Sequence, residues 1–343
     1  MMELNRKWSL GISLLVIGLL VGVTDMSAYA QAKKIKVREA HTETLFMAPV
    51  YIAEAAGYMA EEGIDLELTE VDSGSLAIAA LVSGGVQFVD ADPFMAVQLA
   101  KQGKSIQFIF NLTKRVTLDM VFSNDVVKAK NLSRSMPIAQ RFAALKGLKL
   151  GITKPGAATD VYMRYYLKRA GLDPERDVQI VTAGGGAALM AGIKTKQIDA
   201  FHLSAPTPYL VEREGFGKVI IKSSAGDVPE LDNFLYTGIV VSKEYADKNA
   251  DVIKRWVRAV NKANVLLRKD EPAALKYLKK YFPRMPDDVM ALAMKEIMPA
   301  LSPDGTMNEQ MMQKHLDFLY NTKQIDWKPS GKEGVLWTNA YVK

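Results

Sequence analysis

The 343-residue chain contains no cysteine. This absence excludes disulfide bonds, thiolate zinc sites, iron–sulfur clusters, a cysteine nucleophile and a lipidated amino-terminal cysteine. Histidine is scarce: His41, His202 and His315 lie far apart in the sequence and supply no His-x-x-x-His pair for a metal ion. We therefore expect neither a metal site nor a cofactor.

Motifs of common catalytic sites are absent as well. The sequence has no Gly-x-Ser-x-Gly, His-Glu-x-x-His or Gly-x-Gly-x-x-Gly segment. The neighbouring carboxylates Asp90 and Asp92 could serve acid–base chemistry, but nothing in the sequence pairs them with a substrate. A binding protein without catalytic activity is the simpler interpretation.

Strong charge of one sign is also missing. The formal net charge is +6, and charged residues make up 24% and hydrophobic residues 49% of the chain, as in an ordinary globular protein. Lysines and arginines are spread along the chain and are densest in the C-terminal third, which is typical of solvated helix faces and predicts no nucleic-acid binding. The length suits two lobes of about 100–200 residues each.

The amino terminus has the parts of an export signal. Arg6 and Lys7 form a short basic start, residues 10–23 are apolar, and Ala28-Tyr29-Ala30 places small residues where a signal peptidase reads them. The apolar run is shorter than the ~20 residues that span a bilayer as a helix. We predict cleavage after Ala30 and a mature periplasmic protein without a lipid anchor. The alternative is an uncleaved anchor, which would make the chain a membrane-tethered sensor domain.

Short apolar strands alternate with helical stretches from residue 35 to residue 221, which predicts an α/β fold with parallel sheets. The pattern occurs twice: Glu-Gly-Ile-Asp at residues 62–65 returns as Ala-Gly-Leu-Asp at residues 170–173, in each case between a helix and a strand. The predicted strands are residues 35–39, 64–68, 86–89, 106–110, 148–152, 178–181, 198–201 and 219–221. The predicted helices are residues 49–59, 76–82, 94–101, 159–170, 187–193 and 208–214.

The two copies predict two lobes with connecting segments and a C-terminal helical extension. We interpret the apolar runs 118–122 and 235–241 as flexible crossings between the lobes, and residues 124–142 as a surface loop. Helices are predicted at residues 253–267 and 308–319, and Trp327 and Trp337 are expected to anchor the tail by packing. The predicted division is a signal peptide at 1–30, a first lobe at 33–117 and 236–343, and a second lobe at 118–235.

Polar and small residues follow the predicted strands, where open α/β sheets bind ligands. Each also has a structural alternative, because Thr42, Thr44 and Asp92 could be helix caps and the glycines at 184–186 could form a tight turn. The candidate residues of the first copy are Thr42, Thr44, Ser75, Asp92 and Asn111. Those of the second copy lie in the segments 153–159, 184–186 and 204–206.

The charge of the ligand stays open at this point. Two helix starts, after the segments 153–159 and 184–186, favour an anion such as a sulfonate. Glu43 and Asp92, if they face the cleft, would repel an anion and favour an amine or a donor-rich heterocycle. The candidate loops hold no arginine, which strong anion recognition often uses.

Several stretches resemble a known family. Met-Ala-Pro-Val-Tyr-Ile-Ala-Glu-Ala-Ala-Gly-Tyr at residues 47–58, Ala-Leu-Val-Ser-Gly at 80–84, Leu-Lys-Gly-Leu-Lys-Leu-Gly-Ile-Thr-Lys-Pro-Gly at 145–156 and Ala-Gly-Leu-Asp-Pro at 170–174 carry the resemblance. They are similar to segments of the nitrate/sulfonate/taurine-type solute-binding proteins of ABC importers. Proteins that bind thiamine pyrimidine precursors share the fold and these motifs. The resemblance extends from residue 33 to about residue 320.

The resemblance implies a two-lobed type II periplasmic binding fold, a monomer that closes on a sulfonate, nitrate or taurine-like solute and delivers it to the permease of an ABC importer. A thiamine pyrimidine precursor is the alternative solute. A pyrimidine-precursor synthase-type enzyme is a less favoured alternative, because that relative depends on a cysteine-rich motif. The ligand-loop positions that it implies are His41, Thr42, Glu43, Thr44, Ser75, Asp92, Thr153, Gly156, Ala157, Thr159, Gly185 and Ser204.

One position departs from the family pattern. Such proteins often carry Gly-x-x-Asp in the first lobe, whereas this chain has Gly-Gly-Val-Gln at residues 84–87 and keeps Asp199 in the second. We expect Gln87 to weaken a local helix–strand contact without altering the fold.

Overall fold

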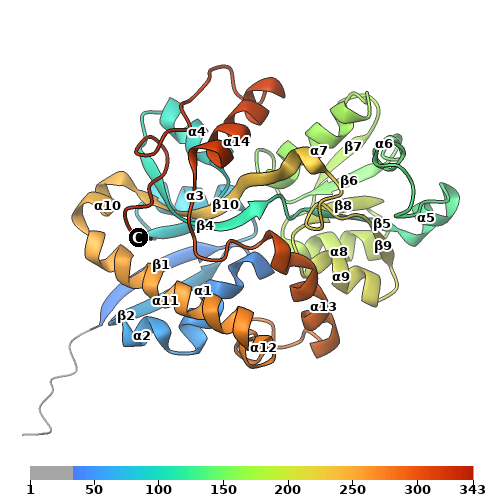
Figure 1. The fold of residues 1–343 in the computed structure, drawn as a ribbon. Coiled ribbons are helices and arrows are strands. Elements are labelled where there is room, and N and C mark those ends of the chain that lie inside the picture. Colours follow the sequence, from blue (N-terminus) through green and yellow to red (C-terminus); the bar gives the residue numbers. More distant parts are fainter. Residues whose placement is uncertain (1–33, 343) are drawn as a thin grey trace, which may run out of the picture. The chain divides into compact units, whose positions relative to one another are not determined.

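The computed structural model describes residues 34–342, which contain two five-stranded sheets with helices packed against them (Figure 1). The predicted signal peptide lies outside the described residues. The first sheet has the order β2-β1-β3-β10-β4 and is formed by β1 (Ile35–His41), β2 (Ile64–Glu70), β3 (Phe88–Ala91), β4 (Ile106–Arg115) and β10 (Asp232–Ser242). The second has the order β7-β6-β8-β5-β9 and is formed by β5 (Asp119–Ser123), β6 (Lys149–Ile152), β7 (Gln179–Thr182), β8 (Ala200–Leu203) and β9 (Gly217–Ile221).

The two sheets repeat one arrangement. In the first sheet, β1 pairs in parallel with β2 and β3, and β10 lies antiparallel beside β3. In the second sheet, β6 pairs in parallel with β7 and β8, and β5 lies antiparallel beside β8. The predicted duplication of an α/β pattern is confirmed.

The crossings between the sheets differ from the prediction. The runs 118–122 and 235–241 fall almost entirely in β5 and β10, and each of these strands is hydrogen-bonded on both edges. The chain passes between the sheets through residues 116–118 and 222–231, and Val116 N donates to Leu231 O across the two connections. The interpretation of both runs as flexible crossings is therefore wrong, because a strand paired on both sides cannot flex alone.

Helices cover the strands of both copies (Figure 1). The predicted helix at 49–59 is two helices, because Gly57 adopts a φ of 82° that ends the first one. The helices of the first copy are α1 (Ala48–Ala55), α2 (Tyr58–Glu61), α3 (Gly74–Val82) and α4 (Pro93–Lys101), with a 3-10 turn η1 (Leu45–Met47). Those of the second are α5 (Asn124–Ala129), α6 (Ile138–Ala143), α7 (Ala158–Arg169), α8 (Gly186–Lys194) and α9 (Thr207–Arg213).

The prediction of a loop at residues 124–142 is wrong, since α5 and most of α6 lie there. The hydroxyl of Ser123 caps α5 by accepting from Val126 N, and Phe142 of α6 is buried against Tyr166. These local signals were hidden among serines, lysines and a proline that are more typical of loops.

The C-terminal part is helical, as predicted, with α10 (Lys243–Lys248), α11 (Ala250–Lys269), α12 (Glu271–Leu278), α13 (Asp287–Ile297) and α14 (Glu309–Asn321). The apolar stripe of α11 faces the first sheet, where Trp256 stacks on Phe88. Trp337 is buried, and its Nε1 donates to Gly331 O at 2.7 Å. Trp327 is 39% exposed, so the expected anchoring role holds for Trp337 only.

Gln87 keeps the contact that it was expected to weaken. Its Oε1 accepts from Arg38 N of β1 at 2.9 Å, and Asp199 Oδ2 accepts from Lys149 N of β6 at 2.8 Å. An amide oxygen accepts a hydrogen bond as a carboxylate oxygen does, so the substitution preserves the geometry.

Within residues 34–342, no helix is both long and apolar enough to cross a bilayer.

Candidate ligand-binding site

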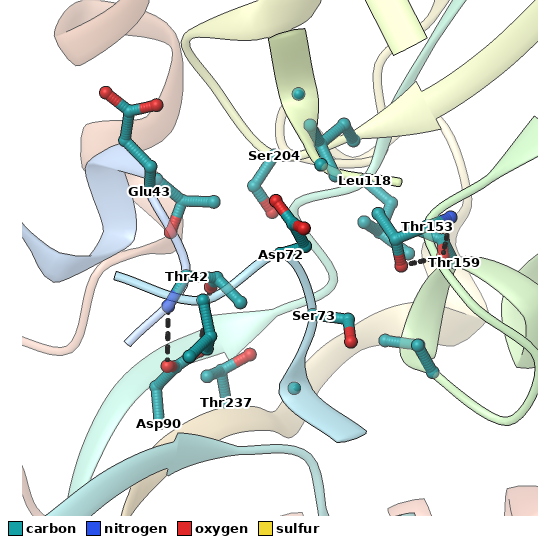
Figure 2. Close-up of a pocket in the computed structure, with 18 of the residues that line it drawn as sticks. Thr42, Glu43, Asp72, Ser73, Asp90, Leu118, Thr153, Thr159, Ser204 and Thr237 are labelled. Carbon is teal, nitrogen blue, oxygen red and sulfur yellow. Dashed lines mark hydrogen bonds between the residues drawn. The ribbon is translucent and has the colours of Figure 1, made fainter. Parts of the chain in front are cut away.

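A cavity of about 290 Å³ lies where loops of the two sheets meet (Figure 2). The loops after β1, β2 and β3 line one side, and the loops after β6, β7 and β8 line the other. Because these strands run parallel within each sheet, their carboxyl ends gather at one edge, as the sequence predicted. Leu45 N of η1 also donates to Ala205 O of the opposite side at 2.7 Å, which ties the two sets of loops together.

Nine of the thirteen predicted site residues line this cavity. They are Thr42, Glu43, Thr44, Asp92, Thr153, Ala157, Thr159, Gly185 and Ser204. The structure thus brings together predicted residues from five separate strand-end loops.

The other four, His41, Ser75, Asn111 and Gly156, lie outside the lining. The Nδ1 of buried His41 lies 2.9 Å from Tyr51 Oη, and Ser75 Oγ lies 3.1 Å from Ser73 Oγ. Asn111 Nδ2 donates to Thr306 O, and Gly156 N donates to the Asp160 carboxylate. Each of the four therefore interacts with its own protein neighbours.

Sequence reasoning missed several lining residues. Asp72, Ser73 and Asp90 belong to strand-end loops that the sequence did indicate, so the same rule could have selected them. Tyr236 and Thr237 come from β10, which follows the whole second copy along the chain. No local signal relates β10 to these loops, because its place in the first sheet depends on the return crossing.

Two buried carboxylates form the floor of the first-sheet side. Asp90 accepts two hydrogen bonds from Thr42, to Oδ1 from the backbone N at 3.0 Å and to Oδ2 from Oγ1 at 2.9 Å. Asp92 caps α4 by accepting from Phe94 N at 2.6 Å, so its predicted capping role is confirmed. Burial raises the pKa of Asp90 to about 6 and that of Asp92 to about 7.

Asp92 is also approached from the second sheet's helices and from the C-terminal part. Tyr162 Oη of α7 donates to Asp92 Oδ2 at 3.4 Å, and His315 Nε2 of α14 lies 3.6 Å from Asp92 Oδ1. Burial lowers the pKa of His315 to about 3, and its Nδ1 lies 2.6 Å from Leu235 O. His315 is therefore neutral near pH 7, so it does not give the Asp92 carboxylate a cationic partner.

The second-sheet side presents two helix starts. The N-cap residues of α7 and α8, Ala157 and Gly185, supply no side-chain cap. A Cβ placed on Gly185 would lie 2.7 Å from Asp72 Oδ1, so the Asp72 carboxylate reaches across the cavity to the start of α8. In Figure 2 this carboxylate lies between the Thr42–Asp90 pair and the Thr153–Thr159 pair.

Hydroxyl groups and apolar side chains complete the lining. Thr44 Oγ1 is buried and has no hydrogen-bond partner among residues 34–342, whereas Ser204 Oγ lies 2.6 Å from Thr117 Oγ1. Phe46, Met95 and Leu118 supply apolar surface. Within the described chain the lining has no histidine or lysine to activate a nucleophile, and no group of three His, Asp or Glu side chains is placed to hold a metal ion.

The sequence profile of the NMT1-like family matches residues 30–278. The chain belongs to the NMT1-like family.

Individual relatives of the family are distant. The chain is 24% identical over 232 residues to the putative binding protein YtlA of Bacillus subtilis, covering 67% of this chain and 65% of that protein. It is 26% identical over 194 residues to the nitrate/nitrite binding protein NrtA of a Nostoc species, covering 53% and 44%. The riboflavin-binding protein RibY of Chloroflexus aurantiacus is 24% identical over 321 residues, covering 92% and 81%. The chain thus spans less than two thirds of the length of YtlA and NrtA.

Solved structures show the fold. A protein of Bordetella bronchiseptica superposes with a TM-score of 0.74 at 23% identity, covering 90% of this chain and 96% of the other. The alkanesulfonate-binding protein SsuA of Xanthomonas axonopodis, bound to MOPS, superposes with a TM-score of 0.70 at 15% identity, covering 87% and 96%. The predicted two-lobed periplasmic binding protein fold with a C-terminal helical extension is therefore confirmed.

Proposed function

We propose that this NMT1-like protein is the solute-binding component of an ABC importer. It captures a small polar solute in the cavity between its two sheets and delivers it to a membrane permease. The observation that carries the proposal is the cavity itself, which is lined by strand-end loops of both sheets and has the size of a small-molecule site. The relatives named as nitrate and riboflavin binders support the same role.

The proposal includes the cellular setting predicted from the sequence. The chain is exported, cleaved after Ala30 and acts as a monomer in the periplasm. Amino-terminal sequencing of the exported protein tests this part, and a chain that still starts at Met1 would favour a membrane-tethered sensor instead. The outcome does not depend on which solute is bound.

The identity of the solute is a separate question. The sequence-based candidates are a sulfonate, nitrate or a taurine-like compound, with a thiamine pyrimidine precursor as the alternative. Relatives named for nitrate, bicarbonate and riboflavin show that membership of this group of proteins is compatible with very different solutes. The class of solute therefore has to be inferred from the residues that line the cavity of this chain.

Differential scanning fluorimetry of the purified protein tests the binding function. A bound solute stabilises the folded state by about 2.7 kcal/mol at a concentration 100 times its Kd, which raises Tm by several degrees for a chain of this size. We expect such a rise with at least one polar solute from a panel of anions, amines, amino acids and heterocycles. A folded protein whose Tm no solute changes would contradict the proposal, and turnover of a solute would favour the synthase-type enzyme.

A further inference from the structure

We infer that the solute of this cavity is a small organic cation, a protonated amine or amidine, held by the carboxylates of the first-sheet loops. This inference rests on the proposed binding function and narrows it to one class of solute. It separates this protein from binders of nitrate, bicarbonate or sulfonate.

The charged lining residues carry the first step. Within the described chain, every charged residue that lines the cavity is acidic, although the whole protein has a net charge of +6. These residues are Glu43, Glu70, Asp72, Asp90 and Asp92. An oxyanion would meet like charge and no basic side chain, and arginine is the residue that proteins use most for strong anion recognition. A cation would meet opposite charge from several loops.

The helix starts on the second-sheet side do not reverse the preference for a cation, because each of them already has a carboxylate nearby. Asp72 lies against Gly185 at the start of α8. At the start of α7, Asp160 Oδ2 accepts from Gly156 N at 2.9 Å, and Thr159 Oγ1 accepts from Thr153 N. A negative charge next to a helix amino terminus satisfies its partial positive charge. Each helix start therefore has a negative charge beside it, which lowers its attraction for an anion.

The hydrogen-bonding groups point the same way. An ionised carboxylate only accepts hydrogen bonds, and each has about four lone-pair sites. Asp90 uses two of them for Thr42, and Asp92 uses one for Phe94 N and a longer one for Tyr162. The remaining sites need donors, which an ammonium or amidinium group supplies. The hydroxyl of Thr44, 96% buried and without a partner among residues 34–342, gives a further polar contact in the cavity.

The rest of the lining fits an organic body rather than a bare ion. Phe46, Met95 and Leu118 are apolar, and Tyr236 of β10 adds an aromatic ring. An aromatic ring face attracts cations and packs against apolar groups. A cavity of about 290 Å³ is larger than an inorganic ion requires.

Three planar molecules of nearly equal shape and different charge provide the test: benzamidine (+1), benzamide (neutral) and benzoate (−1). Isothermal titration calorimetry at pH 8 should give an affinity for benzamidine at least tenfold higher than for benzoate, with benzamide between them. Nitrate, bicarbonate and ethanesulfonate should bind more weakly than benzamidine. Tighter binding of any of these anions would overturn the inference and leave the proposed function standing. Failure of every compound, here and in the fluorimetry panel, would contradict both.

Two matched variants test whether the cation lies beside the Asp72 carboxylate. Asp72→Asn removes one lining charge from an exposed side chain and should lower the affinity for benzamidine about fivefold to tenfold. Asp65→Asn removes an exposed charge from β2, outside the cavity lining, and should leave the affinity within twofold of the unmodified protein. Equal losses in both variants would show a general charge effect, and no loss in Asp72→Asn would contradict the role given to this carboxylate.

Discussion

At the scale of single residues, Glu39 shows how far burial can alter an ionisable group. Its side chain is fully buried in β1, Oε2 accepts from Trp256 Nε1 at 3.2 Å, and Oε1 has no partner among residues 34–342. Burial raises the pKa of Glu39 to about 8, against the attraction of the indole N–H. Glu39 is therefore mostly protonated at neutral pH in the folded protein.

The free energy of unfolding should therefore depend on pH in a way that can be assigned to Glu39. The folded state holds the proton of Glu39 more tightly than the unfolded chain, so its contribution to stability falls as the pH rises from about 4.5 to about 8. Glu39→Gln keeps the shape and removes the titration. We expect the variant to match the unmodified protein near pH 4.5 and to be more stable by about 5 kcal/mol at pH 9.

Urea unfolding across that pH range measures the difference. Other buried carboxylates, such as Asp119, titrate in both proteins, so only the difference between the two curves reports on Glu39. A constant difference over the whole range would contradict the assignment.

Residue-level predictions from the sequence succeeded where the signal was local. The capping of α4 by Asp92 depends on an acidic residue directly before a proline, and both are visible in the sequence. The orientation of His41 was not predictable in this way. Its ring turns toward Tyr51 of α1 and not into the cavity, and this depends on how α1 packs beside β1.

At the scale of secondary-structure elements, α13 connects the two halves of the described chain. It packs against α9 of the second copy and against η1 of the first. Two ion pairs join it to the second copy: Glu296 with Lys222 at 2.7 Å, and Asp288 with Arg213 at 3.1 Å. The side chains of the first pair are 14% and 23% exposed, and those of the second pair are more than 60% exposed.

The two pairs on one helix should contribute differently to stability. Removing a charge from a largely buried pair leaves its partner poorly solvated, whereas an exposed pair is screened by water. We expect Glu296→Gln to lower the free energy of unfolding by about 1–2 kcal/mol and Asp288→Asn to have no measurable effect on it. Urea unfolding at low and high salt measures both changes, and equal losses would show that burial does not distinguish the pairs.

Among the elements, the strands and helices of the two copies were predictable from periodicity, whereas β5 and β10 were misinterpreted. Both are apolar strand-like runs, but a sequence does not state which sheet a strand joins. In the structure β10 pairs with β3 and β4, and β5 pairs with β8 and β9. Pairing between segments so far apart in the chain depends on the tertiary fold.

At the scale of the whole molecule, Gly185 marks a point at which the two sides of the cavity come close to each other. A Cβ there would lie 2.7 Å from Asp72 Oδ1 and 3.6 Å from Asp72 Cα, too close for the carboxylate to keep its place.

The substitution Gly185→Ala should therefore weaken solute binding. We expect an affinity about fivefold to tenfold lower, because the carboxylate of Asp72 must turn away from the start of α8 or the two sides must stay further apart. Calorimetry measures the affinity, and small-angle X-ray scattering of the free and the solute-bound protein tests whether the proposed closing of the two sides becomes smaller. Unchanged affinity in Gly185→Ala would contradict the contact between Asp72 and α8 in the bound state.

The repeated α/β pattern, the helical C-terminal part and the loops from which the cavity is built could be predicted from the order of residues, because strand and helix periodicity and strand-end polarity are local properties. Which side chains of those loops face the cavity, and what surrounds them, became known from the folded arrangement. It placed Tyr236 in the lining and Asp72 beside Gly185, across the gap between two sheets. Charge balance in a cavity is a sum over groups that meet only after folding, so the preference for a cation emerges from the assembled site.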